Sequence, residues 1–270
     1  MTSTTSTASP RALVTNDDGI DAEGLRTLAS VAVEAGLDVV VAAPHRESSG
    51  SSASLTALEK DGRLVVHERR LTGLNGVRAL AVEANPGLIA LTAARGAFGP
   101  PPDLVLSGVN HGRNTGHAVL HSGTVGAALT LSTHGCRALA VSLADGQAGH
   151  WNTAAEIARR ALDWLLQTGE VVALNLNVPD LPLAELRGLR WARLAAFGAA
   201  QTNVTEVGEG YVQLQMADVQ AEHEAGTDAA FLAAGFATVT ALRAPCEATG
   251  VDLSALADDL GAGQRMHTSP

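Results

Sequence analysis

The chain has 270 residues, of which 46% are hydrophobic and 17% are charged, and its net charge is −10. This size and composition predict a soluble globular protein with one large α/β domain, or one domain with an appended element. The basic residues include a single lysine, Lys60, so we expect no polybasic surface for a nucleic-acid polymer or a membrane. The sequence also lacks the Gly-Lys-Ser/Thr motif of the classical phosphate-loop ATPases, which excludes that class.

Residues 1–10 are expected to form a disordered tail. They are rich in Ser and Thr, and they lack the basic start and apolar stretch of a secretory signal. No window approaches the ~20 apolar residues that a membrane-spanning helix requires. Cys136 and Cys246 are too few for a disulfide framework. A cytoplasmic location is therefore the expectation.

Apolar runs alternate with amphipathic stretches up to about residue 180. This alternation predicts a Rossmann-like three-layer α/β core with a mostly parallel sheet over residues 11–180. Apolar runs predict strands at 11–15, 39–43, 103–107, 138–143 and 171–178, with short strands between 63 and 83. Helical spacing predicts helices at 23–35, 86–98 with a proline in the first turn, from 122 onward, and 153–167.

The pattern changes after residue 180. Strands are expected at 189–194, 211–216 and 236–242, separated by polar loops. We therefore expect a smaller β-rich extension or oligomerisation arm over residues 181–243. Residues 244–270 are expected to form a C-terminal tail with one amphipathic stretch at 251–260.

Three polar loops follow predicted strands, and the first carries the adjacent carboxylates Asp17 and Asp18 before Gly19. The others are 48–50, which includes Ser49, and 110–114, which begins at Asn110. Because carboxyl ends of parallel strands share one sheet edge, these loops should converge. Two carboxylates, a hydroxyl and an amide oxygen suit Mg²⁺ or Mn²⁺ with positions left for water. An Asp-Asp-Gly turn alone is more often a plain turn, so the coincidence of three loops carries the prediction.

Ser122, Gly123 and Thr124 open a predicted helix of small residues. Unpaired N–H groups and partial positive charge at a helix start favour a phosphate. Ser122 also fits a plain helix cap, and both roles are compatible. The serine-rich segment 44–52 is too long and polar for a simple connector and is interpreted as a functional loop.

Histidines at 111, 117 and 121 crowd one loop. Their spacing matches no common zinc signature and no cysteine lies nearby in sequence, so zinc is not favoured. His121 directly precedes the predicted phosphate-binding turn, where an imidazole can protonate a leaving oxygen. A surface histidine without function is the alternative.

Several motifs carry a family resemblance: Thr-Asn-Asp-Asp-Gly-Ile at 15–20, Ala-Ala-Pro-His-Arg-Glu-Ser-Ser-Gly at 42–50, Ser-Gly-Val-Asn-His-Gly-Arg-Asn-Thr-Gly at 107–116 and Ser-Gly-Thr-Val-Gly-Ala-Ala at 122–128. In this order and spacing, they resemble the SurE family of survival proteins, which are metal-dependent 5′/3′-nucleotidases. The resemblance extends through residues 175–179, 226–228 and 239–240, and so covers about 11–243.

The resemblance implies one divalent cation, Mg²⁺ or Mn²⁺, held by Asp17, Asp18, Ser49 and Asn110. It implies phosphate contacts from Asn114, Ser122, Gly123 and Thr124, with Ser49 also near the substrate. It further implies a homodimer or homotetramer that exchanges a carboxyl-terminal arm.

The expected activity is hydrolysis of phosphate monoesters, most of all nucleoside 5′/3′-monophosphates, with Asp17, Asp18 and His121 as catalytic residues. Water is the favoured nucleophile, because an aspartate tied to a metal attacks poorly; direct attack by Asp17 is the alternative. A non-catalytic nucleotide-binding or regulatory module is the main competing function. A metal-dependent deacetylase is a third, disfavoured because the nearest histidine downstream of the Asp pair is His45.

Overall fold

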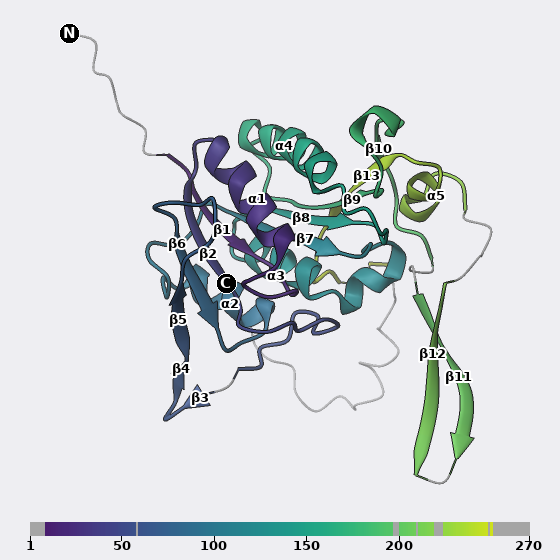
Figure 1. The fold of residues 1–270 in the computed structure, drawn as a ribbon, viewed down its shortest axis with the longest axis horizontal. Helices are drawn as coiled ribbons and strands as arrows, with labels where there is room; N and C mark the ends of the chain where they lie inside the picture. Colours follow the sequence, from purple (N-terminus) through teal and green to yellow (C-terminus); the bar gives the residue numbers. More distant parts are fainter. Residues whose placement is uncertain are drawn as a thin grey trace, which may run out of the picture.

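The computed structural model describes residues 9–57, 59–196, 200–208, 210–218, 224–247 and 249–250. Its centre is a nine-stranded sheet in the order β10-β13-β9-β8-β7-β1-β2-β6-β5 (Figure 1). The strands are β1 (Arg11–Thr15), β2 (Asp38–Pro44), β5 (Val66–Arg69), β6 (Arg78–Val82), β7 (Leu104–His111), β8 (Arg137–Leu143), β9 (Ala173–Val178), β10 (Leu189–Trp191) and β13 (Ala237–Leu242). The six strands from β9 to β6 run parallel, whereas β5 pairs antiparallel with β6 and β13 antiparallel with β9.

Helices cover both faces of this sheet, which confirms the predicted three-layer core. Helices α1 (Glu23–Glu34) and α4 (Trp151–Gln167) pack together on one face, and α2 (Pro86–Ala94) and α3 (Gly123–Ser132) on the other. Strand β1 shows why the sequence folds this way. Ala12 and Val14 join the core on the α1 and α4 side, and Leu13 joins the opposite core. A strand buried on both faces must be continuously apolar, as these runs are.

Helix α2 is shorter than the sequence predicted. It begins at Pro86, as expected, but ends at Ala94 rather than near Phe98. The reason lies in Gly96, which has a φ of +84°. A glycine in this left-handed conformation, two residues after the last helical residue, is a common way to terminate a helix.

The region beyond residue 180 is partly continuous with the central sheet. Strand β13 pairs with β9, and β10 pairs with β13, so the central sheet includes strands from beyond residue 180. By contrast, β11 (Ala200–Gly208) and β12 (Tyr211–Asp218) form a separate antiparallel hairpin that projects from the body of the molecule (Figure 1). The sequence analysis did not anticipate β11 or the short helix α5 (Asp228–Ala233).

Four short elements complete the fold. Strands β3 (Glu59–Lys60) and β4 (Arg63–Leu64) form a small hairpin, and η1 (Gly116–His121) and η2 (Leu183–Glu185) are 3₁₀ helices. Residues 1–8 and the amphipathic stretch at 251–260 lie outside the described residues. Among the helices that the structure describes, none is long and apolar enough to cross a membrane.

Candidate functional site

The candidate site lies where the order of the sheet reverses. From β1 the chain continues to β2 on one side, and it returns later to β7 on the other side. Ligands of open α/β sheets bind in the crevice outside the strand ends at such a point. Asp17 and Asp18 follow β1, and Asn110 lies near the end of β7, so three predicted ligands meet here.

A bulge in β7 sets the position of Asn110. The pairing of β7 with β8 shifts between Ser107 and Asn110, where Gly108 adopts a φ of +130°. A Cβ atom on Gly108 would lie 2.2 Å from the carbonyl oxygen of Val141, so only glycine fits. Beyond the bulge, the Asn110 side-chain nitrogen donates to the carbonyl of Gly112 at 2.7 Å. The bulge thus redirects the end of β7 toward the site.

Asp17 is buried, with only 3% of its surface exposed. Its carboxylate accepts hydrogen bonds from the Thr124 hydroxyl and from the backbone N–H groups of Gly123 and Thr124. Burial raises the pKa of Asp17 above its ordinary value, and these hydrogen bonds oppose the rise. The start of α3 therefore faces the Asp17 carboxylate.

Asp18 is anchored by the backbone N–H of His111, which donates to it at 3.2 Å. Burial, followed by the charge of neighbouring Asp17, raises the pKa of Asp18 to about 6. Two adjacent carboxylates that resist ionisation fit a divalent cation, because a cation stabilises both ionised forms.

Two neighbouring cavities of about 320 Å³ each open at these carboxylates. The first is lined by Asp17, Ser49, Asn110, Asn114, His121 and Ser122, among others. The second is lined by Asp18, Ser49, His111 and Trp151, among others. Ser49 lies between the two, and it is exposed and donates to the Glu47 carboxylate at 2.7 Å.

Of the three residues at the start of α3, only Ser122 lines one of these cavities. Ser122 caps α3, as expected, because its hydroxyl accepts the N–H of Val125 at 3.1 Å. Gly123 and Thr124 are buried behind Asp17 and do not line either cavity. His121 is exposed at the end of η1, on the rim of the first cavity.

Three buried polar residues that the sequence analysis gave no role hold the site together. Asn175 and Asn177 both donate to the carbonyl of Asn114, and the Asn177 side-chain oxygen accepts the N–H of Asn114 at 2.7 Å. Asp228 accepts the N–H of Gly116 at 2.8 Å and so anchors the start of η1. The sequence contains one sign of this role for Asn175 and Asn177, because they occupy alternate positions of an otherwise apolar strand, and buried amides require hydrogen-bond partners.

The three histidines at 111, 117 and 121 do not gather into a metal site. Among the residues that the structure describes, the one group of three or more His, Cys, Asp or Glu with converging ligand atoms is His45, His67 and Glu83.

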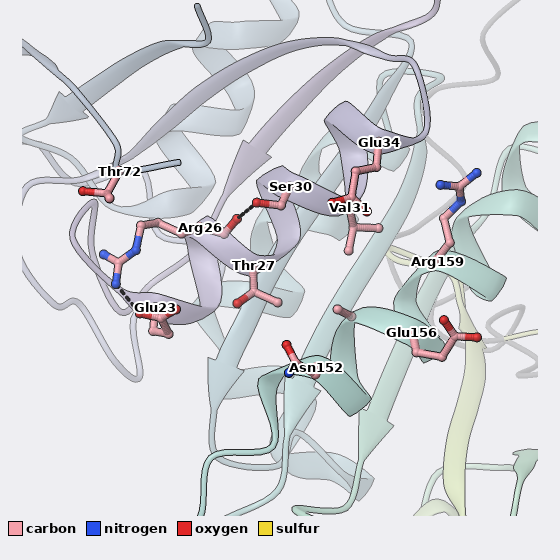
Figure 2. Close-up of a pocket in the computed structure, with 11 residues that line it drawn as sticks. Glu23, Arg26, Thr27, Ser30, Val31, Glu34, Thr72, Asn152, Glu156 and Arg159 are labelled. Atoms are coloured by element: carbon pink, nitrogen blue, oxygen red, sulfur yellow. Dashed lines mark hydrogen bonds and ion pairs between the residues drawn. The ribbon is translucent and has the colours of Figure 1, made fainter. Parts of the chain in front are cut away.

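A larger groove, of about 870 Å³, runs between α1 and α4 (Figure 2). Figure 2 shows Arg26 turned toward Glu23 on α1, with Glu156 and Arg159 presented by α4. None of the predicted site residues lines this groove. The predicted site and this larger groove are therefore separate.

Comparison with known proteins identifies the family of this chain. The family model described as Survival protein SurE matches residues 12–200. This chain belongs to the SurE family. It is 35% identical to the 5′-nucleotidase SurE of Aeromonas hydrophila subsp. hydrophila over 94% of the chain and 97% of that protein. It is 38% identical to the 5′/3′-nucleotidase SurE of Proteus mirabilis, over 85% of the chain and 88% of that protein.

The solved structures include a similar fold. The crystal structure of the SurE protein from Aquifex aeolicus has a TM-score of 0.77 and 26% sequence identity, and the match covers 92% of this chain and 100% of that one. The SurE resemblance expected from the four sequence motifs is thus confirmed, together with the α/β fold.

Proposed function

We propose that this SurE-family chain is a nucleotidase, which hydrolyses nucleoside 5′/3′-monophosphates with the help of a divalent cation. The observation that carries the proposal is the cavity of about 320 Å³ that gathers Asp17, Ser49, Asn110, His121 and Ser122 from four separate segments of the chain. The relatives named 5′-nucleotidase and 5′/3′-nucleotidase support the choice of substrate.

Asp17, Asp18, Ser49 and Asn110 are the residues that would hold the cation, Mg²⁺ or Mn²⁺. Their oxygens are the ligands that these hard cations prefer. When bound, the cation supplies positive charge for the phosphoryl oxygens and favours ionisation of water. The raised pKa values of Asp17 and Asp18 support this assignment, because both carboxylates gain from a nearby positive charge.

The phosphoryl group would lie between this carboxylate pair and the segment from Asn114 to Ser122. Asn114 and Ser122 line the cavity directly. Gly123 and Thr124 would act indirectly, because their N–H groups and the Thr124 hydroxyl donate to the Asp17 carboxylate and orient it. Phosphoryl transfer needs positioning and charge stabilisation more than covalent catalysis, which suits such a preorganised site.

His121 is the proposed general acid. Water attacks phosphorus, the ester P–O bond breaks, and the leaving oxygen takes a proton from the protonated imidazole, while the proton released by the water passes to solvent, from which the ring is reprotonated. Its exposed position on the cavity rim would place the ring beside the leaving nucleoside.

The hairpin β11–β12 is the proposed oligomerisation arm of a homodimer or homotetramer. It projects from the body (Figure 1), and the large side chains of Tyr211 and Val212 are 52% and 54% exposed on it. Burial of such side chains against a second copy would stabilise an assembly.

A substrate panel with a metal titration tests the function. We expect phosphate release from nucleoside monophosphates that is abolished by EDTA and restored by Mg²⁺ or Mn²⁺. The non-catalytic alternative predicts nucleotide binding without phosphate release under every metal condition. Phosphate release that is insensitive to EDTA would contradict the proposed role of the cation.

A further inference from the structure

A second group of metal-ligand side chains, which does not include Asp17 or Asp18, lies where three adjacent strands meet at the β5 edge of the sheet. His45 directly follows β2, Glu83 directly follows β6, and His67 lies in β5. One ligand atom from each of these residues lies within 4.8 Å of the others. Strands β2, β6 and β5 are consecutive neighbours in the sheet (Figure 1), so the fold itself brings the three side chains together.

The backbone fixes this juxtaposition firmly. The N–H of His45 donates to the carbonyl of Val82 at 2.8 Å, which continues the β2–β6 pairing up to the cluster. The N–H of Glu83 donates to the carbonyl of Val65 at 3.0 Å, which ties it to the start of β5. A cluster held by strand pairing costs little conformational entropy when it binds an ion.

The side chains already interact. The His45 imidazole donates to the Glu83 carboxylate, and the rings of His45 and His67 pack edge to face with centroids 5.5 Å apart. The His45 and Glu83 side chains are 29% and 21% exposed, so solvent reaches the cluster. The hydrogen bond from His45 is the main cause that lowers the pKa of Glu83, which keeps that carboxylate ionised near neutral pH.

We propose that His45, His67 and Glu83 form a second cation site, which binds a transition-metal ion of the Zn²⁺ type. Two imidazole nitrogens and one carboxylate are a common ligand set for zinc, with a fourth position left for water. Mg²⁺ prefers an all-oxygen set, so this site and the site at Asp17 and Asp18 differ in the ion they select.

Arg69 is the internal competitor for this site. Its guanidinium lies 3.3 Å from the second ring nitrogen of His45 and donates toward it. A bound cation would be repelled by this charge, so Arg69 must weaken the affinity of the site. The alternative is that Arg69, His45 and Glu83 only form a polar network that stabilises the edge of the sheet. The two interpretations differ because only the metal site predicts that removal of the Arg69 charge increases the affinity for a cation.

Occupancy would have a local structural effect. His45 begins the 45–52 segment that carries Ser49, and His67 belongs to the edge strand β5. An ion between them would link that segment to the edge of the sheet. Ligands that bind only the folded state raise its stability, so Zn²⁺ should raise the melting temperature.

Calorimetric titration of the tag-free full chain with ZnCl₂, in excess Mg²⁺ to saturate oxygen-lined sites, tests the proposal. We expect one equivalent to bind and to raise the melting temperature. His67→Ala should weaken binding by more than about 10–100-fold, the loss typical of removing even an outer partner of a metal ligand. Because His67 is exposed on an edge strand, this variant should keep the fold. Arg69→Gln should bind Zn²⁺ more tightly than the wild type.

His134→Ala is the matched control, because His134 is exposed in the segment between α3 and β8 and is not part of the cluster. It should bind Zn²⁺ like the wild type. Asp18→Asn should also retain this binding, which separates the second site from the proposed catalytic one. Equal Zn²⁺ affinity in His67→Ala and the wild type, or no saturable binding by a folded wild type, would overturn the proposal.

Discussion

The start of helix α3 offers a direct way to disturb the candidate site without removing any functional group. Gly123 packs against Asp17 so closely that a Cβ atom there would lie 2.8 Å from both Cβ and Oδ2 of Asp17, and 2.7 Å from the Ser51 hydroxyl. Ordinary carbon contacts are about 3.5–4.0 Å, so Gly123→Ala must shift Asp17, or the start of α3 that donates to it, by about 0.7 Å or more in relative position. The substitution therefore tests whether the position of this carboxylate matters.

We expect a large loss of activity and a smaller loss of stability. Overpacking of a buried site costs about 1–3 kcal/mol. Part of that cost is offset, because alanine favours a helix over glycine by up to about 1 kcal/mol. A displacement approaching 1 Å can reduce the rate by about 100-fold, so kcat should fall about 10–100-fold in a protein that still folds.

Phosphate release from a nucleoside monophosphate, measured across a Mn²⁺ titration and beside a thermal melt, checks this expectation. Gly169→Ala is the matched control, since nothing lies within 4 Å of a Cβ atom there. It should keep full activity and an equal or slightly raised melting temperature. A folded Gly123→Ala protein with wild-type kcat and metal response would refute the assigned role of Asp17.

Four further changes test the catalytic site, the stability of the fold and the proposed arm. Asp18→Asn should lose metal-dependent phosphate release even at saturating Mn²⁺, and near-normal activity would remove the proposed metal centre. Replacing His121 with Ala should lower kcat by about 10²–10⁴-fold, equivalent to about 3–5 kcal/mol, if it is the general acid. A smaller decrease would contradict that role. Asp180→Asn should lower the unfolding free energy by about 2 kcal/mol, because three backbone N–H groups and the His150 ring donate to its carboxylate. Charged replacements of Tyr211 and Val212 should reduce the molecular mass measured by light scattering if the hairpin holds subunits together. An unchanged mass would contradict the proposal that the hairpin is the oligomerisation arm.

The Asp180 prediction also carries a pH dependence. Burial alone would raise the pKa of Asp180, but the hydrogen bonds from His150, Gly149 and Ala148 together lower it below its ordinary value of 3.8. A lowered folded-state pKa stabilises the protein above the unfolded pKa, and this stabilisation is lost as the pH falls through the folded value. The gap in melting temperature between wild type and Asp180→Asn should therefore be constant near neutral pH and narrow below about pH 4.

Much of the core was predictable because its signals are local. Strand β1 is a run of apolar residues buried on both faces, and helix α4 repeats its buried positions at helical spacing. Pro86 and Ser122 mark the starts of their helices by their own chemistry. The hairpin strand β11 escaped prediction because its sequence is polar and its main partner is β12.

By itself, the sequence determined which residue types lie at the ends of the parallel strands, and therefore that Asp17, Asp18, Ser49 and Asn110 belong near one edge. Only the tertiary structure decided that the α3 amides face Asp17, that Asn175 and Asn177 hold Asn114, and that His45 meets His67 and Glu83. The physical reason is that strand and helix signals depend on neighbours along the chain. Hydrogen bonds and ligand clusters instead depend on groups brought together from distant positions by the packing of the sheet.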